Sequence, residues 1–398
     1  MSGEYGTARQ GWLLVWSLAA AQLVSWGALY YGFSLFVVPM EAELGWSRAS
    51  LNGALSVGLL TAGAFAYPVG TWIDRHGGRW LMTAGSVGGA LLLVAWSRVD
   101  NLAAFYVIWA GLGLAMAMTL YEPAFVVLTR LFAQSYRTKI TAMTLVGGFA
   151  STVFIPLTQA LISLVGWRDA LLVLALIVAA ICIPVHALLL RDRAADRRDT
   201  SGASAPVLGG QAVRRAMQTP AFWGLIVCFV AYYGTFSAMT FHLVPMLTDR
   251  DFPPEVIVTA LAVIGPAQVA GRMVLLTIGR RLRTATIGRI VTMMFPVSVV
   301  VLILLPHSLI ALFVFAALYG TANGVMTIVR GTAIPELLGR EGLGAINGAI
   351  SLPATASKAA APLAAALIWA ASGGYGAVLW TVVAGGFVAV LGFWFATR

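Results

Sequence analysis

Three charged residues interrupt apolar stretches of the sequence, where a full charge is costly and usually serves a function. Lys358 lies in PATASKAAAPLAAALIWA, Arg272 in QVAGRMVLL and Glu122 in LYEPAF. A guanidinium matches the two oxygens of a carboxylate, and an ammonium adds a mobile point charge. An apolar setting strengthens both attractions because it lowers the local dielectric. Arg272 and Lys358 are therefore predicted to bind a small organic anion of the carboxylate type.

Glu122 indicates a different chemistry, the exchange of a coupling proton. A carboxyl group among apolar side chains has its ionised form disfavoured, so it can take up and release a proton near neutral pH. His242 in FHLVPM is the second candidate for proton coupling. The alternatives are structural: an ion pair between Glu122 and a buried cation, and a hydrogen-bonding His242 that lines the outer vestibule.

Four polar or aromatic residues are predicted to line the same substrate site. Tyrosine pairs recur in YYGF and YYGTF, and an asparagine lies among glycines in GTANGV. The predicted lining residues are Tyr30, Tyr31, Tyr233 and Asn323. Packing or anchoring at the membrane interface is the alternative for the tyrosines, and helix packing is the alternative for the asparagine.

The composition determines which elements must hold these residues. The chain has 398 residues, of which 60% are hydrophobic and 10% charged, whereas a soluble protein carries about a quarter charged residues. Apolar runs long enough to cross a hydrocarbon core of about 30 Å recur throughout the chain. Backbone groups in lipid must be hydrogen-bonded within each span, so the spans are helices. The sequence therefore predicts an all-α membrane protein.

Breaks at glycine, proline and charged residues divide the apolar runs into twelve predicted transmembrane helices. They lie at 12–39, 48–72, 80–97, 102–129, 138–164, 168–190, 220–247, 255–279, 285–306, 308–329, 343–370 and 375–396. The first run is too long for a signal peptide, so we expect it to be retained as a span.

Basic residues gather in alternate loops and predict the orientation. They are Arg75, Arg79, Arg130, Arg137, Lys139, the run from Arg191 to Arg215, Arg280, Arg281, Arg283, Arg289 and Arg340. The positive-inside rule makes this side cytoplasmic, with both termini inside. The net charge of +10 is then a topology signal, and nucleic-acid binding is not expected. We expect a multi-pass protein in the inner (plasma) membrane, in contact with the lipid bilayer.

Catalytic and metal chemistry finds little support in the sequence. The two cysteines, Cys182 and Cys228, lie inside apolar runs, and the four histidines are scattered. We therefore expect no disulfide framework, no metal site and no cofactor. Without a nucleophile–base constellation, an enzyme is not expected either.

The chain is predicted to consist of two six-helix halves, residues 1–190 and 220–398, joined by a hydrophilic cytoplasmic linker at 191–219. At an offset of 206 residues the halves align without gaps, for example STVFIPLTQALI with SKAAAPLAAALI. Such a parallel pseudo-twofold repeat predicts a substrate site at the interface of the halves, near mid-membrane. The charged residues break the symmetry, since at this offset they have uncharged counterparts: Thr152 for Lys358, Ala66 for Arg272 and Ile328 for Glu122.

The loop GTWIDRHGGRW at 70–80 resembles the G-x-x-x-D-R-x-G-R-[RK] motif of the major facilitator superfamily. The matching residues are Gly70, Asp74, Arg75, Gly77 or Gly78, and Arg79. In that family the glycine permits close helix contact, and the aspartate interacts with the N-terminus of the eleventh helix and with a nearby arginine, here Arg130. The resemblance implies a latch that closes the cytoplasmic side. The symmetric loop, GRRLRTATIGR, has Arg280 where Asp74 stands, so no second latch is expected.

Within that superfamily, LGLAMAMTLYEPAF and GGFASTVFIPLTQALISLVGWRDAL resemble the monocarboxylate transporter and oxalate/formate antiporter branch. Arg272 on the eighth helix and Lys358 on the eleventh look like the antiporter's substrate-binding pair. Animal monocarboxylate transporters place an aspartate four residues before that arginine and a lysine on the first helix. Here the first position is Gln268 and the first span has no lysine, so a coupled proton would use Glu122 or His242.

These features predict a secondary active transporter of a small organic anion, working as a monomer by alternating access. Its mode is proton-coupled symport or anion exchange. The alternative is a proton-coupled exporter of cationic or neutral compounds, with Glu122 as the acid that meets the substrate, although Arg272 and Lys358 would repel a cation. A receptor on a transporter scaffold is a rival from another class, and the short loops argue against it.

Overall fold

The computed structural model describes residues 8–190, 209–278 and 282–398. Every regular element in these ranges is a helix, and no strand occurs in them. Eleven helical segments among them are long and apolar enough to cross a membrane. The prediction of an all-α membrane protein is confirmed.

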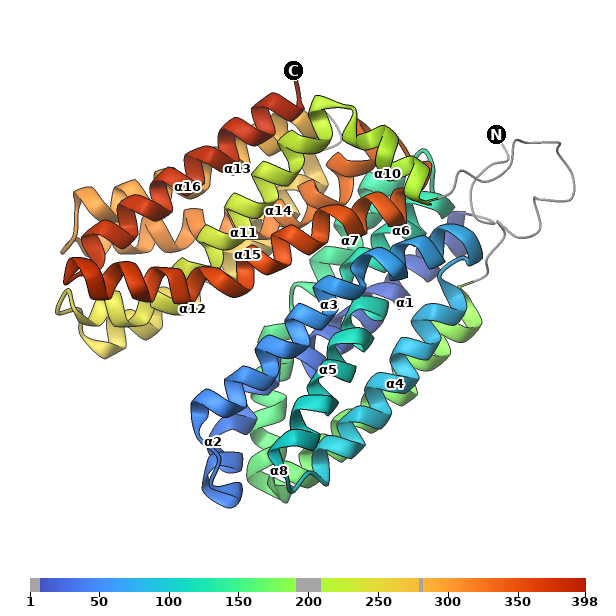
Figure 1. Cartoon of the computed structure of the whole chain (residues 1–398), viewed down its shortest axis with the longest axis horizontal. Coiled ribbons are helices and arrows are strands. Elements are labelled where there is room, and N and C mark those ends of the chain that lie inside the picture. Colours follow the sequence, from blue (N-terminus) through green and yellow to red (C-terminus); the bar gives the residue numbers. More distant parts are fainter. Residues whose placement is uncertain (1–7, 191–208, 279–281) are drawn as a thin grey trace, which may run out of the picture. The chain divides into compact units, whose positions relative to one another are not determined.

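The described chain forms two compact units (Figure 1), of which the first comprises Met1–Val213 and Arg340–Ala349. Its helices are α1 (Ala8–Trp26), η1 (Gly27–Tyr31), α2 (Phe33–Leu44), α3 (Arg48–His76), α4 (Arg79–Ser97), α5 (Leu102–Thr119), α6 (Tyr121–Leu131), α7 (Tyr136–Gly147), α8 (Ala150–Pro184) and η2 (Val185–Leu189). The segments η1 and η2 are single turns of π-helix.

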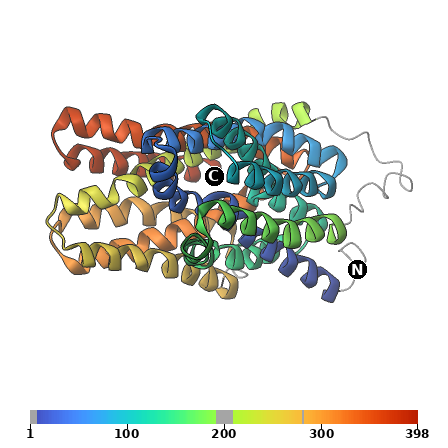
Figure 2. The same ribbon diagram turned by 90° about the horizontal axis from the view of Figure 1, so that it is seen from below.

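The second unit comprises Arg214–Gly339 and Ile350–Arg398. Its helices are α11 (Pro220–Thr248), α12 (Pro254–Ile278), α13 (Thr284–Leu304), α14 (Leu309–Leu337), α15 (Leu343–Ser372) and α16 (Tyr375–Ala396). In this unit α14 packs against α12 and α13, and α11 packs against α16. Figures 1 and 2 show the helices from two directions. The first seven residues of α15 belong to the first unit and the rest to the second.

The predicted linker is only partly described. Residues 191–208 lie outside the described ranges, while Gly209–Met217 form a short helix, α10. The division of the chain into halves at this linker stays a prediction.

The segment Tyr136–Leu189 covers the predicted fifth and sixth helices. It has 54 residues, which as one straight helix would extend about 80 Å, far more than the roughly 30 Å of hydrocarbon. The chain bends at Gly166, whose φ of 81° is a left-handed conformation that glycine adopts without a Cβ penalty. The described helices therefore provide eleven or twelve spans, depending on whether this segment is counted once or twice.

The predicted fourth helix, 102–129, is not continuous in the structure, so the prediction is wrong in this respect. Leu120 has an extended backbone, with φ −76° and ψ −159°, and separates α5 from α6. Pro123 accounts for the break, since it has no N–H for the carbonyl of Thr119 and its ring crowds that carbonyl. The side-chain amide of Gln22 donates to the Thr119 oxygen instead, at 2.6 Å.

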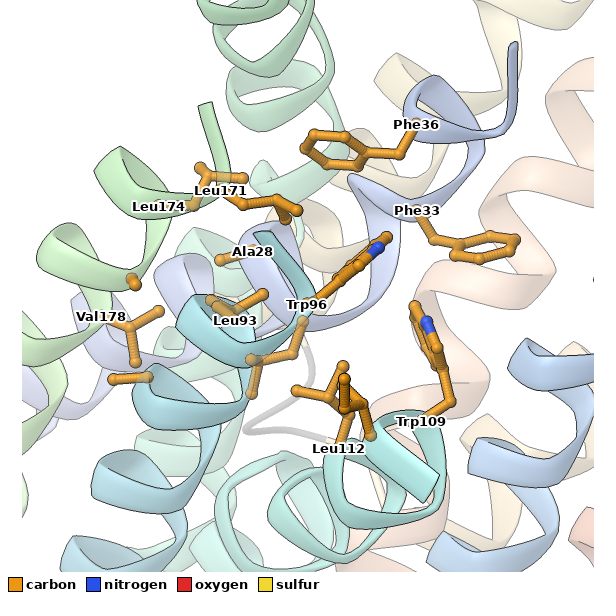
Figure 3. Close-up of a cluster of buried hydrophobic side chains, with 14 of the residues drawn as sticks. Ala28, Phe33, Phe36, Leu93, Trp96, Trp109, Leu112, Leu171, Leu174 and Val178 are labelled. Atoms are coloured by element: carbon orange, nitrogen blue, oxygen red, sulfur yellow. The ribbon is translucent and has the colours of Figure 1, made fainter. Parts of the chain in front are cut away.

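A core of large apolar side chains fixes α1 and α2 against α4, α5 and α8 (Figure 3). The Trp109 ring meets Phe33 edge-on at a centroid distance of 4.7 Å and Trp96 at 5.1 Å. All three side chains are almost completely buried. This packing holds the first span beside the break at Leu120.

Candidate functional site

Arg272 lies on α12 and is only 4% exposed. Its Nε donates to the carbonyl oxygen of Gly324 on α14 at 3.1 Å. The helices can approach so closely because a Cβ at Gly324 would lie 2.4 Å from the carbonyl oxygen of Gln268. Within the described residues Nη1 of Arg272 has no hydrogen-bond partner. A buried charge with a spare donor is suited to an anionic ligand.

Lys358 is half-buried on α15, and hydrogen bonds at its own backbone and at Ser357 join α15 to α11. Ser237 donates to the backbone carbonyl of Lys358 at 2.8 Å, and Ser357 donates to the carbonyl of Val230 at 2.9 Å. A Cβ at Gly234 would lie 2.4 Å from the Ser357 hydroxyl, so glycine is needed there. These contacts fix the backbone from which the Lys358 side chain extends.

Arg330 on α14 is a further buried basic residue of the second unit, and sequence analysis missed it. The residue is 8% exposed. Its guanidinium donates to the Ser351 hydroxyl and lies 5.3 Å from the ring centroid of Tyr233 and 5.7 Å from that of Phe229. The tenth helix was predicted to end at 329, which placed Arg330 in a loop. The apolar residues on both sides of it in TIVRGTAIP were the available signal.

Ser351 and Lys358 are seven residues apart on α15, so they lie on the same helical face about 10 Å apart along the axis. Arg330 reaches this face through Ser351, and Tyr233 contacts Arg330 one turn before Ser237 on α11. The second unit thus brings Arg330, Tyr233 and Lys358 to one side of the α11–α15 pair.

His242 and Asn323, the other predicted site residues of the second unit, form hydrogen bonds with neighbouring residues. His242 Nε2 is 2.9 Å from the Pro362 carbonyl and Nδ1 is 3.2 Å from the Tyr375 hydroxyl. A neutral ring that donates from Nε2 and accepts at Nδ1 satisfies both contacts, as expected for a residue that links α11 to α15 and α16. Asn323 is half-buried on α14, and its backbone carbonyl accepts from Thr327. Their roles in transport stay predictions.

Glu122 lies in the first turn of α6, two residues after the break at Leu120. The N-terminus of a helix attracts negative charge, a feature that a continuous fourth helix would not have offered. Beside this break, Tyr30 and Tyr31 belong to η1 and both contact the ring of Trp26. The first unit therefore brings the predicted acid and the predicted tyrosines to neighbouring elements.

Asp74, near the end of α3, meets the first residues of α15 within the first unit. Its two carboxylate oxygens accept from the backbone N–H groups of Gly344, at 3.0 Å, and Ala345, at 2.9 Å. These amides have no carbonyl partner inside the helix, so the carboxylate caps the α15 N-terminus. A Cβ at Gly70 would lie 1.9 Å from the carbonyl oxygen of Gly344, which explains why glycine precedes the aspartate by one turn.

The arginines of the 70–80 loop and its surroundings are spread over several partners. Arg130 donates to the carbonyl of Ile73, the residue before Asp74, so its charge acts on the carboxylate without a direct ion pair among the described residues. Arg79 donates from Nε to the carbonyl of Ala187 on η2 at 2.7 Å. Arg75 is exposed. The gating role of the cluster stays a prediction.

A cavity of about 210 Å³ lies between α11, α15 and α16. Most of the described residues that line it are small and apolar, among them Gly234, Ala361 and Val382, and none of them is charged. It borders Ser357 but is not formed by Arg272, Lys358 or Arg330. Without a cation among its described lining residues, this cavity is not a candidate for the anion site.

Comparison with known proteins places these features in context. The sequence model described as Major Facilitator Superfamily matches residues 18–303. Monocarboxylate transporter 13 of Bos taurus is 26% identical over 338 residues, covering 83% of this chain and 76% of the relative.

Two solved structures have the same fold. The fucose:proton symporter FucP of E. coli has a TM-score of 0.73 at 12% identity, over 98% of this chain and 99% of that chain. The human organic anion transporter MFSD10 (TETRAN) has a TM-score of 0.67 at 16% identity, over 98% of this chain and 100% of that chain.

Proposed function

The chain belongs to the major facilitator superfamily of transporters, and from that premise we propose that it carries a small organic anion across the inner membrane by alternating access. In this proposal two six-helix halves, related by a parallel repeat, move against each other around the substrate. Both termini and the linker are cytoplasmic. The anion moves together with a proton or in exchange for another anion.

One observation carries the choice of an anion: Arg272 is buried in an apolar span, and its Nη1 has no hydrogen-bond partner in the part of the chain that the structure describes. A substrate carboxylate would supply the missing acceptor. Lys358 supplies a second positive charge in the same unit, and Arg330 a third. The relative named monocarboxylate transporter and the neighbour named organic anion transporter support the same substrate class.

The repeat gains support from the helix bounds. Adding 206 to the first residues of α3, α4 and α5 gives 254, 285 and 308, while α12, α13 and α14 begin at 254, 284 and 309. Agreement within one residue over three consecutive helices is expected if both halves descend from one six-helix unit.

Glu122 and His242 remain the candidates for proton coupling in this proposal. Glu122→Gln resembles the protonated acid in size, so a coupling role predicts loss of accumulation driven by a pH gradient while counterflow exchange persists. Normal accumulation in Glu122→Gln would remove this residue from the coupling mechanism and leave His242.

The test is transport by the purified full chain in proteoliposomes. We expect uptake of propionate and other short monocarboxylates, and no comparable uptake of propionamide, which has the same heavy-atom skeleton without the charge. Arg272→Gln should reduce carboxylate affinity by about tenfold to a hundredfold, the effect of one lost charge-assisted contact.

A matched control is Arg289→Gln on α13 of the same unit, because Arg289 is hydrogen-bonded to Thr397 and not to the proposed site. It should transport like the wild type. Equal uptake of propionamide and propionate, or equal affinities in the two arginine variants, would overturn the anion proposal.

A further inference from the structure

Two irregularities of the first unit meet at one place in the fold. The first span changes from α-helix to π-helix at Gly27–Tyr31, and the fourth span breaks at Leu120. Gln22 joins them, since its side-chain amide donates to the carbonyls of Thr119, at 2.6 Å, and Leu120, at 3.4 Å. One-turn π segments and broken membrane helices are frequent at binding sites.

The fold itself does not require these irregularities. At the offset of 206 residues, Gly27–Tyr31 corresponds to 233–237 in α11 and Leu120 to Met326 in α14, and both helices run through these positions without interruption. The polar residues are not repeated either, because Gln22 corresponds to Cys228 and Glu122 to Ile328. The irregular region is therefore specific to the first unit.

Aromatic rings surround the indole of Trp26 at this place. Its ring centroid lies 5.1 Å from Tyr121, 5.4 Å from Tyr30 and 6.0 Å from Tyr31, and all four side chains are partly exposed. The faces of aromatic rings carry negative electrostatic potential and attract cations, above all alkylated ammonium groups.

Two residues with oxygen acceptors neighbour these rings along the chain, Gln22 one turn before Trp26 and Glu122 directly after Tyr121. Because the amide nitrogen of Gln22 faces two carbonyls, its Oε1 is directed elsewhere, is completely buried and has no hydrogen-bond partner among the described residues. Glu122 follows Tyr121 directly and contributes a carboxylate. The indole N–H of Trp26 is likewise without a hydrogen-bond partner in the described part of the chain, so a ligand oxygen would find a donor there.

We propose that this region, defined by Gln22, Trp26, Tyr30, Tyr31, Tyr121 and Glu122, binds an organic ammonium group with a nearby oxygen, as in an amino alcohol. The rings accept the alkylated nitrogen, Glu122 balances its charge, and the Trp26 N–H donates to the oxygen. An inorganic cation fits less well, since hard cations take about six oxygen ligands. An anion would meet a carboxylate and an unpaired carbonyl oxygen.

Choline and 3,3-dimethylbutan-1-ol test this proposal, because they have the same shape and differ only in a charged nitrogen against a neutral carbon. Each is titrated calorimetrically into the purified full chain in detergent at constant ionic strength. We expect choline to bind at least tenfold more tightly than its carbon analogue. Replacing the buffer salt with sodium chloride should leave the affinity for choline unchanged.

Two substitutions at one position separate the ring from the hydroxyl. Tyr121→Leu removes the ring and should weaken choline binding by about twofold to thirtyfold, the range of cation–π energies. Tyr121→Phe keeps the ring and should bind within about twofold of the wild type. Glu122→Gln should weaken binding by about tenfold or more. Thermal unfolding of each variant verifies that it is folded.

Equal binding of choline and 3,3-dimethylbutan-1-ol by the wild type overturns the proposal, and this comparison needs no variant. Displacement of choline by sodium chloride would identify an inorganic cation site instead. Equal losses in Tyr121→Leu and Tyr121→Phe would exclude the ring faces. Since choline has no carboxylate, its failure to bind leaves the organic-anion proposal standing, and propionate transport tests that proposal separately.

Discussion

The hydroxyl of Ser237 on α11 donates to the backbone carbonyl of Lys358 on α15, at 2.8 Å. This carbonyl needs an outside donor because Pro362, four residues later, has no N–H to offer it. The proline releases the carbonyl, and a polar side chain of the neighbouring helix satisfies it. A side chain of the neighbouring helix thus helps to hold the backbone at the intramembrane lysine.

In the first unit, too, a proline frees a backbone carbonyl that a side chain of another helix then satisfies. Pro123 releases the carbonyl of Thr119, and Gln22 on α1 donates to it. The consequences differ, because α15 stays helical at Lys358 whereas the fourth span breaks at Leu120. In both units a proline therefore lies close to a residue of a predicted site, one turn after Lys358 in the second unit and directly after Glu122 in the first, and loosens the helix there.

Ser237→Ala should destabilise the second unit. The Lys358 carbonyl would lose its donor in an apolar setting, which costs about 1–3 kcal/mol, and the melting temperature should fall accordingly. Thr277→Ala is the matched control, since that hydroxyl bonds only to carbonyls of its own helix, Met273 and Val274. Equal melting temperatures of the two variants would show that the Ser237 contact contributes nothing to stability.

Lys358→Ala should weaken binding of a carboxylate by about tenfold to a hundredfold, since one charge-assisted contact is worth about 1.5–3 kcal/mol. Lys358→Arg keeps the charge with a different shape and hydration, so it should impair binding less than alanine does without restoring the wild type. Calorimetric titration with propionate measures both effects.

The structural alternative for Lys358 gives a different pattern. If the lysine serves chiefly in an ion pair with Glu122, Lys358→Ala lowers the melting temperature, and adding Glu122→Gln restores it. Unchanged propionate affinity in Lys358→Ala would exclude the carboxylate role.

The spans could be predicted from sequence because each depends on local apolar length and on hydrogen bonds inside one helix. The break at Leu120 could not be predicted, since the donor that makes it tolerable, Gln22, lies 97 residues before its acceptor Thr119. Pro123 was visible and indicated a loosened helix, but proline alone does not distinguish a kink from a break.

For a similar reason, only some of the basic residues of the candidate site could be predicted from the sequence. Arg272 and Lys358 stand out because apolar residues surround them in sequence, whereas Arg330 lies seven residues before the end of α14 and was assigned to a loop. Its burial comes from α11 and α15, through Tyr233, Phe229 and Ser351. The apolar residues around it in TIVRGTAIP indicated burial, but the partners on the other helices could not be read from the local sequence.

Arg330→Lys should separate charge from shape at this position. Lysine keeps the positive charge, but it lacks the planar group that lies over the Tyr233 ring and reaches Ser351. If Arg330 contributes mainly its charge to the anion site, Arg330→Lys should bind propionate within about threefold of the wild type, and Arg330→Gln should bind about tenfold more weakly. Equal affinities of both variants and the wild type would assign Arg330 to packing alone.

Asp74→Asn should slow transport while leaving equilibrium substrate affinity within a few fold. The amide can accept from only one of the two backbone N–H groups of Gly344 and Ala345, and its own NH₂ opposes the other. The contact with the α15 N-terminus weakens, which shifts the balance between conformations and leaves the binding residues unchanged. Exchange rates in proteoliposomes and calorimetric affinities measure the two quantities separately.

Gly344→Ala tests the same latch from the other helix. Its Cβ would lie 2.1 Å from the carbonyl oxygen of Gly70, so the helices must separate and the carboxylate of Asp74 must lose its partners. We expect a slowed exchange rate like that of Asp74→Asn, and normal exchange in the control Gly376→Ala, whose Cβ meets nothing within 4 Å. A collapse of substrate affinity with a normal exchange rate for the bound fraction would show that this contact belongs to the binding site and is not a latch.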